Sequence, residues 1–339
     1  MFSLTIGGIE TMLVDIVNRQ CEKHEVDLII LNDYYDQKLL DSISPRVRVH
    51  LVNRKRKTRS YWKVIQMNFL IWKIRPDIIN THNENIGKYI IYPPAPMCRT
   101  CHCPGNMVED HQKYKAIIAI SKAVEKDMKE RLGLSSIVIE NGIDCKAFKT
   151  TGKKNDGIFR IVQIGRLNGY VKGQNIMLKA FKKLMDYGIQ NVHLDFIGEG
   201  ADKGRMIGLA ERLNITDHIS ILGAKDRQYL YEHLHEYDLL VQPSRFEGFG
   251  LTVAEAMAAK VPVLVSDIEG PMEIIDNGKY GFHFRHGNIE ECAYYMKQIY
   301  QGKIRTNVDD NWQHVSDHYD ISTTVSNYEK TYKQIIASA

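Results

Sequence analysis

The sequence predicts an α/β protein made of two doubly wound, Rossmann-like domains. Short runs rich in β-branched residues alternate with amphipathic helical stretches, which is typical of parallel α/β architecture. The alternation stops at residues 149–157 (KTTGKKNDG), a polar segment without apolar periodicity, and then restarts. A chain of 339 residues also has room for two domains of ordinary size.

The first domain is predicted to span residues 1–148. Its expected strands lie at 25–32, 46–53, 76–83, 97–103, 115–121 and 135–142. Helical segments are expected between them, among them 61–75 and 122–132. A doubly wound domain normally opens with a strand, yet the Gly-containing turn at 6–13 (IGGIETML) follows only five residues. We therefore expect the first strand to be truncated by about five to six residues.

The second domain is predicted to span residues 149–315, and residues 316–339 to form a helical segment that packs on the first domain. Strands are expected at 159–166, 192–198, 218–223, 238–243, 261–266 and 281–284. Helices are expected at 173–187, 202–213, 227–236, 251–260 and 288–300. Two such domains would face a cleft lined by the carboxyl ends of their strands, where ligands of these folds bind.

Composition limits the function classes. The net charge of +4 disfavours a polyanion binder, so nucleic-acid or membrane contact would need a local patch. No apolar run reaches 18 residues and no secretory leader is visible, so we expect a cytoplasmic protein. Six cysteines fit free thiols, and the cluster at 98–103 (CRTCHC) lacks the second knuckle of a structural zinc site.

The most informative segment is 238–275. A buried strand ends near Pro243, and a loop with Glu247 and two glycines then leads into a helix that starts near Leu251. Glycines let backbone N–H groups approach a ligand closely, and a helix N-terminus favours a phosphate. Glu255 lies about one turn into that helix, so the two carboxylates can address different parts of one elongated ligand.

This segment (PSRFEGFGLTVAEAMA, then VPVLVSDIEGPMEII with Glu273) resembles the retaining glycosyltransferases of the GT-B fold, specifically family 4, which includes bacterial cell-envelope mannosyl- and hexosyltransferases. Glu247 and Glu255 match its paired glutamates. The resemblance extends to FRIVQIGRLNGYVKG, where Arg166 and Lys172 match the family's diphosphate-binding pair. IGGIET, CHCPG and IENGID match its Gly loop, its His loop and its interdomain connector.

The resemblance implies a role for each matching residue. Arg166 and Lys172 would neutralise the donor diphosphate, so that no metal and no other cofactor is required. Glu255 would accept hydrogen bonds from the ribose, and Glu247 would hold the donor sugar. His102 would lie near the transferred sugar. The donor-binding loop would comprise Gly248, Phe249, Gly250, Leu251 and Thr252, with Gly8 near the phosphates.

Each assignment has a simpler alternative. Arg166 and Lys172 can be surface cations, since Lys and Arg side chains are mostly exposed. Glu255 can be a solvated helix residue, and His102 can be structural. His82 and Asn83, at another predicted strand end, are candidates for the acceptor side, which the resemblance assigns to the first domain.

A basic run at 54–63 (RKRKTRSYWK) leads into a helix with aromatic residues. Such a loop suits anionic lipid headgroups, although a solvated loop is the alternative. The predicted membrane-contact residues are Arg54, Lys55, Arg56, Lys57, Arg59 and Trp62.

The function expected from the resemblance is retaining, metal-independent transfer of a hexose or N-acetylhexosamine. The donor would be a nucleotide-sugar, with UDP the commonest nucleotide in the family, and the acceptor a lipid-linked glycan or polysaccharide in cell-envelope, capsule or exopolysaccharide biosynthesis. Two alternatives stay open: another enzyme of this fold, such as a nucleotide-sugar epimerase or a phosphorylase, and a non-catalytic partner of a polysaccharide assembly complex. We expect the protein to act peripherally at the inner face of the cell membrane, without binding nucleic acid.

Overall fold

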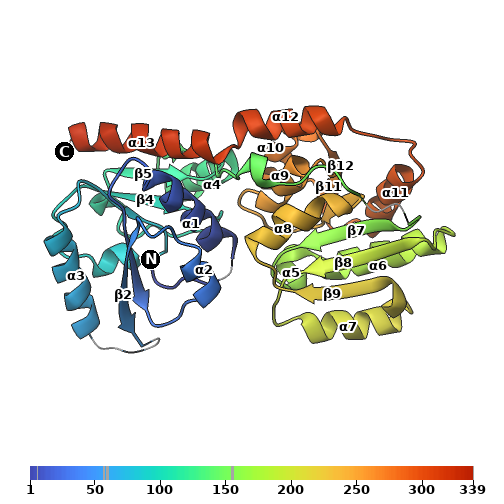
Figure 1. Cartoon of the computed structure of the whole chain (residues 1–339), viewed down its shortest axis with the longest axis horizontal. Coiled ribbons are helices and arrows are strands. Elements are labelled where there is room, and N and C mark those ends of the chain that lie inside the picture. Colours follow the sequence, from blue (N-terminus) through green and yellow to red (C-terminus); the bar gives the residue numbers. More distant parts are fainter. Residues whose placement is uncertain (6, 56–57, 59–60, 154–155, 339) are drawn as a thin grey trace. The chain divides into compact units, whose positions relative to one another are not determined.

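A computed structural model describes the whole chain except residues 6, 56–57, 59–60, 154–155 and 339. The chain forms two compact units (Figure 1). Unit 1 comprises Met1–Gly142 and Ile321–Ala339, and unit 2 comprises Ile143–Asp320. The chain passes from unit 1 to unit 2 after Gly142 and returns to unit 1 after Asp320. These two crossings lie within a few residues of the predicted boundaries at 148 and 315.

Unit 1 contains parallel strands in two groups. One sheet pairs β1 with β2, and the other has the order β3-β4-β5-β6. The bounds are β1 (Asp27–Asn32), β2 (Arg48–Arg54), β3 (Ile79–Thr81), β4 (Met97–Cys101), β5 (Ala116–Ala119) and β6 (Ile137–Val138). Each of the six strands predicted for the first half is therefore confirmed, with shorter bounds.

The first residues run parallel to β1. The N-terminal amino group donates to the Ile29 carbonyl at 2.7 Å, the Leu31 N–H donates to the Met1 carbonyl at 3.0 Å, and Leu4 forms a parallel bridge with Tyr35. Leu4 is completely buried, so this short segment contributes to the core of unit 1. The truncation expected for the first strand stays a prediction.

The helices of unit 1 end where the sequence supplies caps. Ser121 accepts from the Val124 N–H at the start of α4, which ends at Gly133 with a left-handed φ of +66°. The last helix, α13, packs against α1, and Tyr332 Oη accepts from Asn80 Nδ2 at 2.7 Å. The predicted return of the C-terminal helix to the first domain is thus confirmed. The bounds are α1 (Gly8–Gln20), α2 (Gln37–Asp41), α3 (Trp62–Ile74), α4 (Lys122–Leu132) and α13 (Ile321–Ala337), with 3-10 turns η1 (Ile86–Tyr89) and η2 (His111–Lys113).

Unit 2 is built on a parallel six-stranded sheet of order β12-β11-β10-β7-β8-β9. The strand bounds are β7 (Phe159–Ile164), β8 (Val192–Ile197), β9 (Ile219–Gly223), β10 (Leu239–Gln242), β11 (Val263–Ser266) and β12 (Phe282–Phe284). The helix bounds are α5 (Gly169–Lys172), α6 (Gln174–Asp186), α7 (Lys203–Arg212), α8 (Arg227–His233), α9 (Leu251–Ala258), α10 (Glu269–Ile274), α11 (Ile289–Tyr300) and α12 (Val308–His318). Short 3-10 turns are η3 (Cys145–Ala147), η4 (Thr216–His218), η5 (Leu234–Glu236) and η6 (Asp276–Gly278). Again each predicted strand is present.

Helix α6 covers the sheet of unit 2 with an apolar face that includes Phe181 and Leu184, both fully buried. It starts at Gly173, which has a φ of +72° and passes so close to the Pro243 carbonyl that a Cβ would lie 1.9 Å from its oxygen. Only glycine allows this approach, which brings the segment after β7 against the segment after β10. No helix in the described part of the chain is long and apolar enough to cross a bilayer.

Candidate functional site

The strand order of unit 2 reverses between β7 and β10, which are parallel neighbours. The sheet continues through β8 on one side and β11 on the other. In open α/β sheets, ligands bind outside the carboxyl ends of the strands at such a switch point. The predicted donor residues of unit 2 follow these two strands: Arg166 and Lys172 come after β7, and residues 247–255 come after β10.

The two predicted cations differ in their surroundings. Arg166 lies two residues beyond β7, is exposed, and its side chain forms no ion pair with any described residue. Lys172 is the last residue of α5, and its Nζ donates to Glu247 Oε2 in a mostly buried ion pair. The structure thus brings Lys172 and Glu247 into direct contact, and leaves Arg166 available for an anion.

Gln242, the last residue of β10, joins this pair and was missed by the sequence analysis. Its Nε2 donates to Glu247 Oε2 at 2.8 Å, and its Oε1 accepts from Thr252 Oγ1 at 2.8 Å. The hydroxyl of Thr252 therefore orients the buried amide, and the amide orients the carboxylate. A single polar residue at the end of an apolar strand (LLVQ) is the signal that could have revealed it.

Two glycines shape the loop between Glu247 and α9. Gly250 has a φ of +108° and caps the start of α9, where the N–H groups of Leu251 and Thr252 have no acceptor within the helix. Gly270 packs under the loop, since a Cβ there would lie 2.8 Å from the Glu247 carbonyl oxygen. Gly248 and buried Phe249 complete the loop. The result is a helix N-terminus with partial positive charge at the switch point.

Glu255 lies on α9 and is buried, so the alternative of a solvated helix residue is wrong. Its Oε1 accepts from a guanidinium nitrogen of Arg227, the first residue of α8. Arg227 was also missed, because nothing in its local sequence connects it to a residue 28 positions later. A buried carboxylate needs such a partner.

In unit 1, His102 follows β4 directly and is buried. Its Nε2 lies 3.2 Å from Nδ1 of His82, so one imidazole donates to the other. Burial, helped by the charge of Arg99, lowers the pKa of His102 to about 3. Burial and the neighbouring His102 also lower the pKa of His82. Both rings are therefore neutral near pH 7.

The other predicted residues of unit 1 are Asn83 and Gly8. Asn83 follows β3, and its Oδ1 accepts from the Phe2 N–H at 2.8 Å, so it supports the N-terminal segment. Gly8 is the exposed first residue of α1. The structure thus joins His82 with His102 in unit 1, and Lys172, Glu247 and Thr252 through Gln242 in unit 2, whereas Asn83 binds Phe2 and Glu255 binds Arg227.

The described residues include no group of three or more His, Cys, Asp or Glu side chains arranged to hold a metal ion. Cys98 and Cys101 are buried, which raises the pKa of both thiols, whereas Cys103 is exposed. Independence from a metal remains a prediction.

The fold and this site define the class: a doubly wound α/β protein with an anion-attracting helix N-terminus at its switch point. Two family models identify the family within this class. Residues 6–147 match the glycosyltransferase family 4 model, and residues 146–313 match the glycosyl transferases group 1 model. The chain therefore belongs to the group 1 glycosyltransferases, as its motifs indicated.

Curated proteins similar to this chain include glycosyltransferases. An uncharacterized glycosyltransferase of Methanocaldococcus jannaschii is 25% identical over 65% of this chain and 59% of its own length. The phosphatidyl-myo-inositol mannosyltransferase of Mycobacterium tuberculosis is 29% identical over 50% of this chain and 45% of its own. The chain thus spans about half to three-fifths of the length of these curated relatives.

Solved structures share the fold over the whole chain. A glycosyltransferase of Rickettsia africae has a TM-score of 0.81 at 18% identity, covering 100% of this chain and 99% of its own. Anabaena HepE, solved with UDP and glucose, has a TM-score of 0.79 at 19% identity, covering 98% of both chains. The predicted GT-B fold is confirmed.

Proposed function

We propose that this protein transfers a hexose or N-acetylhexosamine from a nucleotide-sugar donor to a lipid-linked or polysaccharide acceptor, with retention of configuration and without a metal. The observation that carries the proposal is the group formed by Arg166, Lys172, Glu247 and the start of α9 at the switch point of unit 2. Its charges and hydrogen-bond donors suit a diphosphate joined to a sugar.

Each residue of this group would have a distinct task. The exposed Arg166 and the N–H groups of Leu251 and Thr252 would bind the phosphates, whose negative charge grows as the sugar departs. Lys172 would share its charge between the leaving phosphate and Glu247, with which it is paired. Glu247, oriented by Gln242, would accept hydrogen bonds from the donor sugar's hydroxyls. Buried Glu255, held by Arg227, would accept from the ribose.

We propose UDP as the donor nucleotide. The family in which the chain lies supports a nucleotide-sugar donor, and HepE, a structural neighbour at 19% identity, was solved with UDP and glucose. We further place the product in a cell-envelope, capsule or exopolysaccharide pathway. The mannosyltransferase relative, whose name gives a phosphatidyl-myo-inositol lipid, supports an acceptor at a membrane.

An exposed apolar stripe on α3 supports contact with an anionic membrane surface. One face of α3 is buried through Val64, Met67 and Ile71. Its opposite face is also apolar: Ile65, Phe69 and Trp72 recur at helical spacing and are 53–71% exposed. A helix with a second apolar face in solvent suits the interface of a bilayer. The same surface includes Tyr61, Trp62, Ile91 and Tyr92, all of them exposed.

Basic residues beside the stripe favour anionic lipid. Lys55, Lys63 and Lys73 flank it in sequence, and Lys55 and Lys73 are exposed. The guanidinium of Arg54 stacks over Tyr89 at 5.0 Å and donates to the Thr58 carbonyl at 3.2 Å, and its contact with a membrane stays a prediction. Arg56, Lys57 and Arg59 lie outside the described residues. We therefore assign membrane contact chiefly to the α3 stripe and its lysines, and propose a peripheral protein at the inner face of the cell membrane.

The test is turnover of donor by single variants. Arg166→Ala and Lys172→Ala should each lower turnover by roughly 10²–10³, the usual loss when one charge-stabilising donor is removed. Lys179→Ala, which removes an exposed lysine from α6, should leave turnover unchanged. The assay measures release of nucleoside diphosphate from a panel of nucleotide-sugars with lipid extract as acceptor. Unchanged turnover in both site variants would contradict the proposal.

The assay also separates the alternatives. Diphosphate binding without hydrolysis or transfer would favour a non-catalytic partner of an assembly complex. Conversion of the sugar without net release of nucleoside diphosphate would favour an epimerase.

A further inference from the structure

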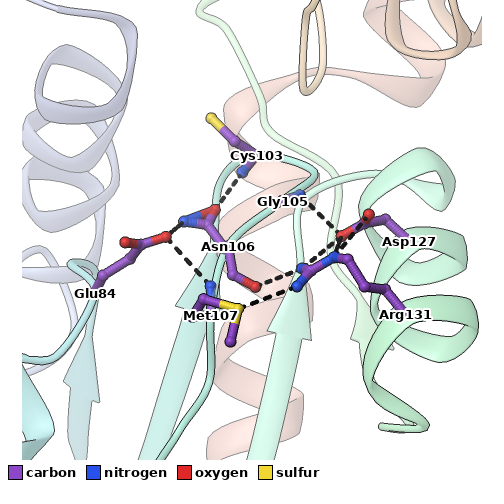
Figure 2. Close-up of polar contacts among 7 residues, drawn as sticks. All are labelled: Glu84, Cys103, Gly105, Asn106, Met107, Asp127 and Arg131. Carbon is purple, nitrogen blue, oxygen red and sulfur yellow. Dashed lines mark hydrogen bonds and ion pairs between the residues drawn. The ribbon is translucent and has the colours of Figure 1, made fainter.

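The loop that follows His102 is fixed from two sides. This loop, residues 103–107 (CPGNM), lies between the segment after β3 and helix α4 (Figure 2). Three charged side chains from those two elements contact it, and none of them was singled out from the sequence: Glu84, Asp127 and Arg131.

On one side Glu84 accepts hydrogen bonds from the loop. Its Oε1 accepts from the Asn106 side-chain amide and from the Met107 N–H at 3.3 Å. The other end of the Asn106 amide accepts from the Cys103 N–H at 2.9 Å, so Asn106 also closes the loop on itself. Glu84 is two residues beyond His82, whose ring contacts His102. One segment therefore holds both the histidine and its loop.

On the other side α4 supplies a charged pair. Asp127 Oδ2 accepts from the Gly105 N–H at 2.9 Å and from Arg131 at 2.9 Å. Arg131 then reaches the loop itself, donating to the Asn106 carbonyl at 2.6 Å and contacting Met107 Sδ at 3.3 Å. Figure 2 shows the guanidinium between the helix and the loop. The planar fork suits this arrangement, because Nε and Nη2 bind Asp127 while Nη2 and Nη1 reach the Asn106 carbonyl and Met107 Sδ.

The exposure of this network indicates what it does. The Arg131 and Asp127 side chains are 32% and 23% exposed, and ion pairs so open to solvent add little to stability. Yet every hydrogen bond that they make beyond their own ion pair ends on the loop, at the Gly105 N–H, the Asn106 carbonyl and Met107 Sδ. This network contributes little to stability, but it determines the path of the loop backbone. Its effect should therefore fall on His102, the residue that the loop directly follows.

We propose that Glu84, Asp127 and Arg131 are positioning residues that hold loop 103–107, and through it the imidazole of His102, in place for sugar transfer. This inference rests on the proposed function, and on the place near the transferred sugar that the family resemblance implies for His102. The three residues themselves touch neither donor nor acceptor. They act by limiting the positions that His102 can take, and a displacement of about 1 Å can reduce a rate by about 10²-fold.

The experiment compares three variants of the full chain. Arg131→Gln removes the fork, Arg131→Lys keeps the charge without the fork, and Lys129→Gln is the matched control, an exposed lysine on the same helix. Two quantities are measured: the steady-state constants for the donor, and the rate at which a disulfide reagent modifies Cys103. Cys103 is the exposed cysteine within the loop, and the other five cysteines of the chain are buried, so the rate reports the loop.

We expect Arg131→Gln to lower kcat by roughly 10- to 100-fold while the donor KM stays within about threefold, because the donor site lies in unit 2. The rate of Cys103 modification should change by at least about threefold, because the thiol is exposed and its reactivity depends on the loop backbone around it. Arg131→Lys should behave like Arg131→Gln, and Lys129→Gln like the wild type. Thermal unfolding verifies that each variant is folded.

Four outcomes would overturn the inference. A changed Cys103 rate with unchanged kcat would mean that the network fixes the loop without serving transfer. Full rescue by Arg131→Lys would mean that charge, and not the fork, matters. If the wild type turned over no donor, the proposed function would fail and this inference with it, whereas an active wild type with unaffected variants would sink the inference alone.

Discussion

At the scale of single residues, the sequence identified the side chains of the site better than it identified their hydrogen-bond and ion-pair partners. Glu247 and Lys172 could be selected from their spacing and motif, but their ion pair joins segments 75 residues apart. Gln242 and Arg227 could not be selected, because their roles depend on what the fold places beside them. A side chain's type is local information, whereas its partner is a property of the folded sheet edge.

The His82–His102 pair predicts a pH dependence of stability. Both pKa values are lowered in the folded protein, that of His102 to about 3, so the folded chain keeps both rings neutral. The unfolded chain takes up protons below about pH 6.5, and it therefore binds more protons than the folded chain. The free energy of unfolding should fall as pH drops from about 6.5 toward 3, by up to about 1.4 kcal/mol per pH unit for each histidine.

Urea unfolding at a series of pH values measures this slope. His102→Gln and His82→Gln should each flatten it between about pH 6 and 4.5, because each removes one titrating group. The charges near the pair, Arg99 and the N-terminal amino group, stay in both variants. Equal slopes in wild type and variants would show that these rings are not protected from protonation.

At the scale of elements, the alternation of strands and helices was sufficient to predict all twelve strands found among the described residues. Their ends were less predictable, and the structure shortens most of them, because the last residues of a run turn into loops that carry the site. The outward stripe of α3 illustrates the limit: periodicity shows that a helix is apolar on two faces, but not which face the core takes.

The loop before α9 predicts a sharp response at Gly270. Gly270→Ala would place a methyl group 2.8 Å from the Glu247 carbonyl oxygen and 3.0 Å from the Phe249 nitrogen, both backbone atoms that can only move with the loop. We expect a loss of about 1–3 kcal/mol in stability from overpacking, together with weaker donor binding. Gly204→Ala in α7, where nothing lies within 4 Å, is the control and should be neutral or slightly stabilising. Equal effects of the two substitutions on donor binding would contradict the loop's role.

The stripe on α3 predicts binding to anionic vesicles. Ile65→Ser combined with Phe69→Ser removes two exposed apolar side chains and should weaken partitioning onto phosphatidylglycerol-containing vesicles by at least about tenfold. Gln66→Ser, on the same helix and exposed, is the control. Binding should also fall with added salt and be weaker on neutral vesicles, because lysines flank the stripe. If the double variant sedimented with vesicles as the wild type does, the proposed membrane contact through the α3 stripe would be contradicted.

At the scale of the whole molecule, the restart of the pattern after residue 157 located the two units, but not their true boundaries. The last helix belongs to unit 1, where buried Tyr328 lies 3.3 Å from the Thr100 hydroxyl. Its polar, helical sequence indicated a packed segment, but the crossing at Asp320 depends on contacts between residues more than 200 positions apart. Such contacts are invisible to local patterns.

The central claim is that a helix N-terminus and two cations bind a diphosphate without a metal. Titration calorimetry with UDP in the presence of EDTA, with GDP in parallel, tests it most directly. The wild type should bind, and Arg166→Ala and Lys172→Ala should each weaken the affinity for the diphosphate by about tenfold or more, because each removes a charge-assisted contact. Uridine, which lacks the phosphates, should bind all three proteins alike. Equal UDP affinity in the three proteins, or binding that appears only with a divalent metal, would contradict the claim.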